Sequence, residues 1–204
     1  MTFKEISDLE NQALDKNKMD QLKNLTQAHE QKARADNNNI EIARAFYYRT
    51  IFEEPKIALL YSDSIIQVTK NSDHLSYPTL GYLLKGHIYY NLSKFQLALL
   101  NYLEAYKLSL EKENTEQQRE ISIAIAAMRN INGQQYAAAE LYKRNLNGLM
   151  RQKNGERIQE EEFRELLLNL STTQLRVQEI DSAKYYAKKG IEQSIIFKDK
   201  SNFR

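Results

Sequence analysis

Cysteine is absent from this 204-residue chain, and glycine and proline are scarce, at six and two residues. Without cysteine there are no disulfides, no thiolate zinc sites and no cysteine nucleophile. Turn-rich β architectures need more glycine and proline than this, so an all-β fold is disfavoured. The abundant residues include Ala, Leu, Glu, Lys, Gln and Arg, which favour helices. The composition therefore predicts helices joined by polar loops.

Strong charge of one sign and long apolar runs are also missing. The net charge is +2, and the lysines and arginines are interspersed with acidic residues rather than gathered on a basic tail. We therefore expect no nucleic-acid binding by this segment. No apolar run approaches the roughly 20 residues that span a bilayer, so we expect no membrane span in this chain. The opening "MTFKEISDLENQ" does not resemble a secretory signal. The compartment stays open: cytoplasmic if the chain is complete, periplasmic if a signal sequence has been removed.

A helix–turn–helix pattern with small residues at fixed places recurs along the chain. In residues 79–112, Gly86 lies in the first helical stretch and Ala98 in the second, with the polar break "NLSKF" between them and Ser93 expected as an N-cap. Similar patterns lie on both sides. The residues expected to be equivalent to one another are Leu22, Ala58, Ala98, Ala139 and Ala183. The spacings between successive members are 36, 40, 41 and 44 residues. Such self-similarity is typical of a solenoid.

The small residues have a physical role in this pattern. A glycine in mid-helix costs about 1 kcal/mol relative to alanine. Gly86 is therefore expected where two helices approach closely, because ordinary side chains hold helix axes about 8–10 Å apart. Aromatic residues such as Tyr89, Phe95 and Tyr102 are then expected to fill the space between helices.

The pattern resembles the tetratricopeptide repeat (TPR) family. Gly86 and Ala98 match its small positions, Tyr102 one of its aromatic positions, and Ala105 its last small position, whereas Lys85 replaces an apolar residue. The resemblance implies an all-α, right-handed superhelical solenoid of about five TPR-like helix-turn-helix hairpins, forming a single array over residues 1-204. The expected hairpins are 4-36, 40-70, 79-112, 118-152 and 157-198.

Candidate catalytic groups are few and have simpler explanations. His29, His74 and His87 lie far apart in the sequence, and a metal site needs converging ligands. The acidic run "EEEFRE" at 160–165 fits the first turn of a helix, and "NSDHLS" at 71–76 fits a loop between repeats. No glycine-rich phosphate loop is present. We expect no catalytic activity, no metal and no cofactor.

The resemblance also implies a binding groove lined by the first helix of each hairpin. The candidate groove residues are Leu83, His87, Tyr90 and Asn91 in the third hairpin, Met128 and Asn132 in the fourth, and Thr172 and Arg176 in the fifth. Apolar residues replace the lysines with which some family members hold a terminal carboxylate, so an extended segment or a helix is the expected ligand. Alternatively, several of these residues pack against neighbouring repeats. His87 is expected to make binding sensitive to pH between about 5 and 8.

The favoured function is a non-catalytic scaffold that binds a protein or peptide of unknown identity on its concave face. The alternative is a sensor or dimerisation segment of a longer bacterial signalling protein, a TPR transcriptional regulator or a histidine kinase, whose output domain is not in this chain. The apolar residues Ile191, Ile195, Ile196 and Phe197 have no following hairpin to cover them. Either further repeats or a homodimer through the C-terminal end is therefore expected.

Overall fold

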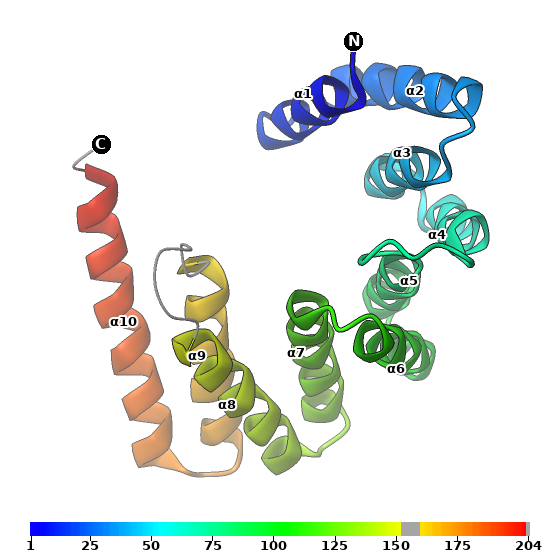
Figure 1. Ribbon diagram of the computed structural model, residues 1–204. Helices are drawn as coiled ribbons and strands as arrows, with labels where there is room; N and C mark the ends of the chain where they lie inside the picture. Colours follow the sequence, from blue (N-terminus) through cyan, green and yellow to red (C-terminus); the bar gives the residue numbers. More distant parts are fainter. Residues whose placement is uncertain (152–159, 203–204) are drawn as a thin grey trace. The chain divides into compact units, whose positions relative to one another are not determined.

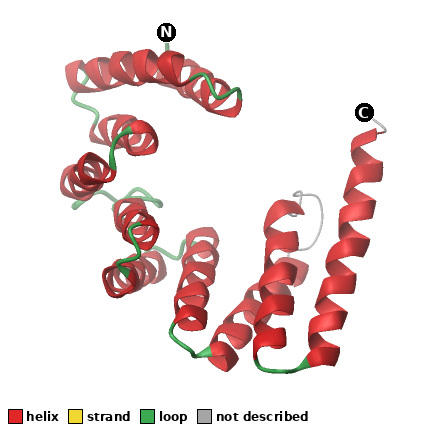
Figure 2. Cartoon of the chain, turned by 180° about the vertical axis from the view of Figure 1, so that it is seen from behind, coloured by secondary structure: helices red, strands yellow, loops and turns green. Residues whose placement is uncertain are grey.

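The protein is built entirely from α-helices in the part that the structure, a computed structural model, describes: residues 1–151 and 160–202 (Figure 2). This confirms the predicted fold class, since the helices form five consecutive hairpins. The helices are α1 (Phe3–Asp15), α2 (Met19–Ala35), α3 (Asn39–Phe52), α4 (Pro55–Thr69), α5 (Thr79–Asn91), α6 (Phe95–Glu111), α7 (Thr115–Ile131), α8 (Gln135–Arg151), α9 (Glu160–Arg176) and α10 (Ile180–Asn202).

The helices gather into two compact units, residues 1–118 and residues 119–204. In the first unit each helix from α1 to α5 packs on the helix that follows it, and in the second α9 packs on both α8 and α10 (Figure 1). The single array over 1-204 stays a prediction. None of the helices in the described ranges is long and apolar enough to cross a membrane. The stretch "RQKNGERI" at 151–158, which its polar sequence predicts to be a loop between repeats, lies outside the described residues apart from Arg151.

Six of the turns between helices share one backbone geometry. Each contains a residue with positive φ, and the next residue donates its backbone N–H to the carbonyl five positions earlier, at 2.8 to 3.0 Å. This bond satisfies a carbonyl at the helix end that would otherwise lack a partner. The six positive-φ residues are Asn17, Asn37, Ser93, Glu113, Gly133 and Gln178.

The turn geometry corrects one expectation about Ser93. Its φ of 57° places it in the left-handed region that closes α5. The N-cap of α6 is Lys94, and no side chain caps that end. The prediction that Ser93 caps α6 is therefore wrong, because the residue serves the end of one helix rather than the start of the next.

The turns also define which residues are equivalent between hairpins. Where the turn lies within a hairpin, a buried residue stands five positions after the positive-φ residue, at Leu22 after Asn17 and at Ala98 after Ser93. In the fourth hairpin the same rule selects Ala138 after Gly133, not Ala139. The predicted equivalence of Ala139 with Ala98 is therefore wrong by one residue, because the three successive alanines at 137–139 cannot be distinguished by size.

The third hairpin shows why a small residue is needed at the helix crossing. A Cβ atom at Gly86 would overlap the ring of Tyr102, which comes from α6 and is buried. The Tyr102 hydroxyl lies 2.9 Å from Nδ1 of His87, one residue after the glycine. The missing side chain thus makes room for the aromatic ring, as the sequence predicts.

A buried charged cluster joins the first three helices. His29 of α2 is fully buried, with its Nδ1 2.8 Å from Glu10 Oε2 of α1 and its Nε2 2.9 Å from Glu41 Oε2 of α3. Glu41 also accepts two hydrogen bonds from Arg44 and has its backbone N–H capped by Asn38. Because both ring nitrogens face carboxylates, both must donate, which favours the doubly protonated ring. Burial alone lowers the pKa of His29, but the hydrogen bonds and charges of Glu10 and Glu41 outweigh it and raise the pKa.

Replacing Gly86 by alanine should destabilise the protein. Overpacking costs about 1–3 kcal/mol, and the gain in helix propensity of about 1 kcal/mol offsets this only in part. The matched control is Gly148→Ala in α8, where an added Cβ meets nothing within 4 Å. We expect the control to leave stability unchanged or raise it, as measured by urea unfolding. A Gly86→Ala variant as stable as the control would contradict the close approach.

The three histidines should titrate in different directions from the ordinary value of 6.5. We expect the pKa of His29 to lie above it, and the pKa values of His74 and His87 to lie below it because burial lowers both. Following the ring protons by NMR across the pH range measures all three. Glu41→Gln should lower the pKa of His29 and leave that of His87 unchanged.

The same titration should appear in the stability of the fold. Since the pKa of His29 is higher in the folded state than in the unfolded chain, its contribution is fully present below about pH 6.5. That contribution is lost as the pH rises through the raised pKa. Urea unfolding at a series of pH values should therefore show a loss that parallels the His29 titration. A free energy of unfolding that does not change as His29 titrates would show that the cluster does not stabilise the fold.

Candidate binding surfaces

The groove residues predicted on α5 differ widely in exposure. Leu83 is only 1% exposed and lies in the core, so it offers no surface to a ligand. His87 is held by the Tyr102 hydroxyl, and burial lowers its pKa below the ordinary value of 6.5. Tyr90 is 38% exposed and packs against Phe95 in a T-shaped arrangement, with 5.9 Å between the ring centroids. Tyr90 and the exposed Asn91 are therefore the two that present surface.

The groove residues predicted on α7 carry the same one-residue error as Ala139. Met128 is completely buried, and Asn132 is exposed in the turn that follows α7 rather than on the helix. Counting from the turn, the positions that correspond to His87 and Asn91 are Ala127 and Ile131. Of these, Ile131 is exposed.

On α9, Thr172 and Arg176 are both exposed. The Thr172 hydroxyl donates to the backbone carbonyl of Leu168 at 3.0 Å or of Asn169 at 3.1 Å, which leaves its oxygen able to accept. The guanidinium of Arg176 uses one N–H towards Asn130 of α7. Its other donors can bind a carboxylate or a backbone carbonyl.

Polar contacts hold α7 and α9 side by side in the second unit. Nδ2 of Asn130 donates to the Thr173 hydroxyl at 3.1 Å, and Oδ1 of Asn130 accepts from Arg176 at 3.4 Å. Further along, Arg119 forms an ion pair with Glu162 at 2.6 Å. We call the surface near the C-terminal ends of these two helices the α7–α9 face; its residues are the half-buried Ala127 and Asn130 and the exposed Ile131, Thr172 and Arg176.

The first unit also contains a polar pocket that the sequence pattern does not predict. It encloses about 640 Å³ beside the α2–α3 turn and the end of α4. The signal that could have indicated it is the polar run "DNNN" at 36–39, because all four residues line the pocket together with Asn71. Its lining residues are Asp36, Asn37, Asn38, Asn39, Ile40, Gln67, Val68, Lys70, Asn71 and Ser72.

The described residues contain no group of three or more His, Cys, Asp or Glu side chains that could hold a metal ion. In the cluster of His29, the two carboxylates lie on opposite ring nitrogens and do not converge on one point. The arrangement is structural, because it ties three helices together.

Comparison with known proteins gives a fold but no family. No known family model matches the chain, and no curated protein sequence matches it. Twenty solved chains are similar in structure. One of them, described as "Crystal structure of MamA protein", covers 94% of this chain and 91% of its own length, with a TM-score of 0.58 and 15% identity.

MamA contains TPR repeats. At 15% identity the likeness shows the fold alone.

Truncating Tyr90 should cost much less stability than truncating a core aromatic. Large-to-small changes of fully buried aromatics cost about 3–5 kcal/mol, which we expect for Tyr102→Ala. Tyr90 is more exposed, so Tyr90→Ala should cost about 1 kcal/mol. Equal losses in urea unfolding would show that Tyr90 is a core residue and remove it from the candidate surface.

The five hairpins and the likeness to MamA together give the chain a TPR-like helical-repeat fold.

Proposed function

We propose that this protein is a non-catalytic scaffold that binds a peptide segment of another protein on the α7–α9 face. The observation that supports it is the exposed guanidinium of Arg176, oriented by Asn130 and flanked by Thr172 and the apolar Ile131. Such a surface offers donors and an acceptor to an extended backbone and an apolar contact to a side chain. Arginine at a fixed position is frequent among the residues that dominate binding energy.

We also propose Tyr90 and Asn91 as binding residues, because both are exposed at the end of α5 in the first unit. The alternative role, as part of a longer bacterial signalling protein, stays a prediction, since none of the contacts described above favours it.

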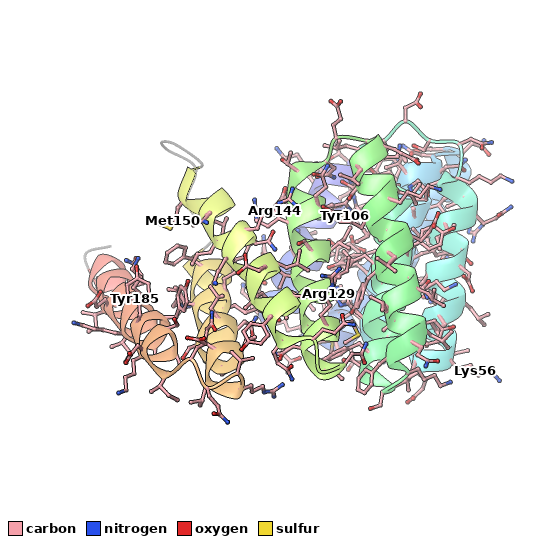
Figure 3. All side chains as sticks on the ribbon, turned by 90° about the horizontal axis from the view of Figure 1, so that it is seen from below. Lys56, Tyr106, Arg129, Arg144, Met150 and Tyr185 are labelled. Carbon is pink, nitrogen blue, oxygen red and sulfur yellow. The ribbon has the colours of Figure 1, made fainter. Side chains whose placement is uncertain are left out.

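Peptide selection tests the proposed function. The full chain is used as bait for a display library of short random peptides, and selected peptides are measured by calorimetry. Arg176→Ala should weaken binding at least about tenfold, which corresponds to about 1.4 kcal/mol. The matched control is Arg144→Ala, which removes an exposed arginine from α8 in the same unit (Figure 3).

Two results would refute this function. One is a selection that yields no peptide with saturable binding. The other is a set of peptides whose affinity is the same for the Arg176→Ala and Arg144→Ala variants.

A further inference from the structure

A second, more apolar surface lies between α9 and α10. It is a groove of about 800 Å³, which we call the α9–α10 groove. Three large apolar side chains on it are more than half exposed: Leu168 at 62%, Ile191 at 63% and Ile195 at 57%. The lining residues are Arg164, Glu165, Leu168, Ser171, Tyr186, Ala187, Gly190, Ile191, Ser194 and Ile195. Apolar surface concentrated in this way is typical of an interaction site.

The preceding hairpin has the same surface, and there it is covered. Helices α9 and α10 begin 45 residues after α7 and α8 (160 − 115 and 180 − 135). Moving each residue of the groove back by 45 positions gives ten residues of α7 and α8. Six of them belong to the core of the second unit or pack against it: Ile123, Ala126, Leu141, Tyr142, Leu146 and Leu149.

The helix that covers that earlier surface is α9. Its contribution to the same core is Phe163, Leu166, Leu167 and Leu170. Just before this run, Glu162 pairs with Arg119 of α7 at 2.6 Å. The covering helix therefore has a carboxylate followed by apolar residues at +1, +4, +5 and +8.

The α9–α10 groove repeats this chemistry with one difference. Arg164 stands where Arg119 stands, so the rim again carries a positive charge, although Arg164 also interacts within the chain. The α9–α10 groove is deeper than the equivalent surface of the preceding hairpin, because the small residues Ala187 and Gly190 replace Tyr142 and Asn145. An added Cβ at Gly190 would meet only Leu167, at 3.7 Å. The groove thus has room for a larger side chain than α9 supplies to the earlier surface.

We propose that the α9–α10 groove binds an amphipathic α-helix of a partner protein. The helix has an acidic residue in its first turn, placed near Arg164, and large apolar residues at +1, +4, +5 and +8 from it. Its apolar side lies on Leu168, Ile191 and Ile195, as α9 lies on the equivalent positions of the preceding hairpin. This is helix-in-groove recognition, with the internal α9 contact as its template. It is independent of the α7–α9 face.

The probe is the chain's own covering helix, a fluorescently labelled peptide of residues 160–176, "EEEFRELLLNLSTTQLR". Fluorescence anisotropy with the full-length chain should show saturable binding below about 1 mM peptide. Ile191→Asp should weaken it at least about tenfold, because a charge replaces a central apolar contact. The matched control, Leu60→Asp, changes a residue of α4 with similar exposure, 58% against 63% for Ile191, and should leave binding unchanged. A peptide with aspartate in place of Leu167 and Leu170 should not bind.

Four results would overturn the proposal. The peptide fails to bind at about 1 mM, or it binds the Ile191→Asp variant as tightly as the wild type, which would indicate that it displaces α9. Loss of binding in Arg176→Ala would show that the groove is not a separate site. A concentration-dependent dimer in sedimentation that Ile191→Asp abolishes would identify a second copy of this chain, rather than a partner helix, as the occupant.

Discussion

The close approach of two helices within each hairpin is the constraint on which the structure depends. At Gly86 the backbone of α5 meets the Tyr102 ring directly, and only the absence of a side chain allows it. The first hairpin meets the same constraint differently. Counted from the helix starts, Glu10 takes the place of Gly86 and Thr26 that of Tyr102. A long side chain from the first helix and a short one from the second thus replace a glycine and an aromatic ring.

This exchange brings a charge into the core, and the charge needs partners. Glu10 has one carboxylate oxygen on His29, while its other oxygen and the Thr26 hydroxyl have no protein hydrogen-bond partner. Leaving buried polar atoms unpaired costs about 1–3 kcal/mol each, so the protonated ring of His29 and its second contact to Glu41 compensate for a real penalty. Buried ion pairs are weak evidence for stability. What this one provides is a directed link between three helices, which apolar packing alone does not specify.

The sequence was sufficient for the fold because the crossing constraint leaves a trace in residue size. Small residues such as Ala98 recur at hairpin spacing, and the helices follow. The sequence does not predict positions correctly where neighbouring residues have the same size. Because three adjacent alanines leave the register of the fourth hairpin ambiguous by one residue, the sequence predicts Met128 of α7 on the surface, although it is buried. The turn at Ser93 is predicted correctly but the role of Ser93 in it is not, since a backbone hydrogen bond offsets the cost of its positive φ.

Contacts between distant residues had no sequence signal at all. Glu10, His29 and Glu41 are separated by 19 and 12 positions, which matches no helical spacing. The surfaces follow from the same repetition that builds the core. The fourth hairpin offers α9 an apolar groove and the fifth repeats it, and the depth of each groove depends on the second helix of its hairpin. Because α10 has alanine and glycine where α8 has tyrosine and asparagine, the α9–α10 groove differs in depth from the surface of α7 and α8 that α9 covers. A ligand would therefore be selected by the size of its apolar residues, while Arg164 at the rim would orient its acidic end.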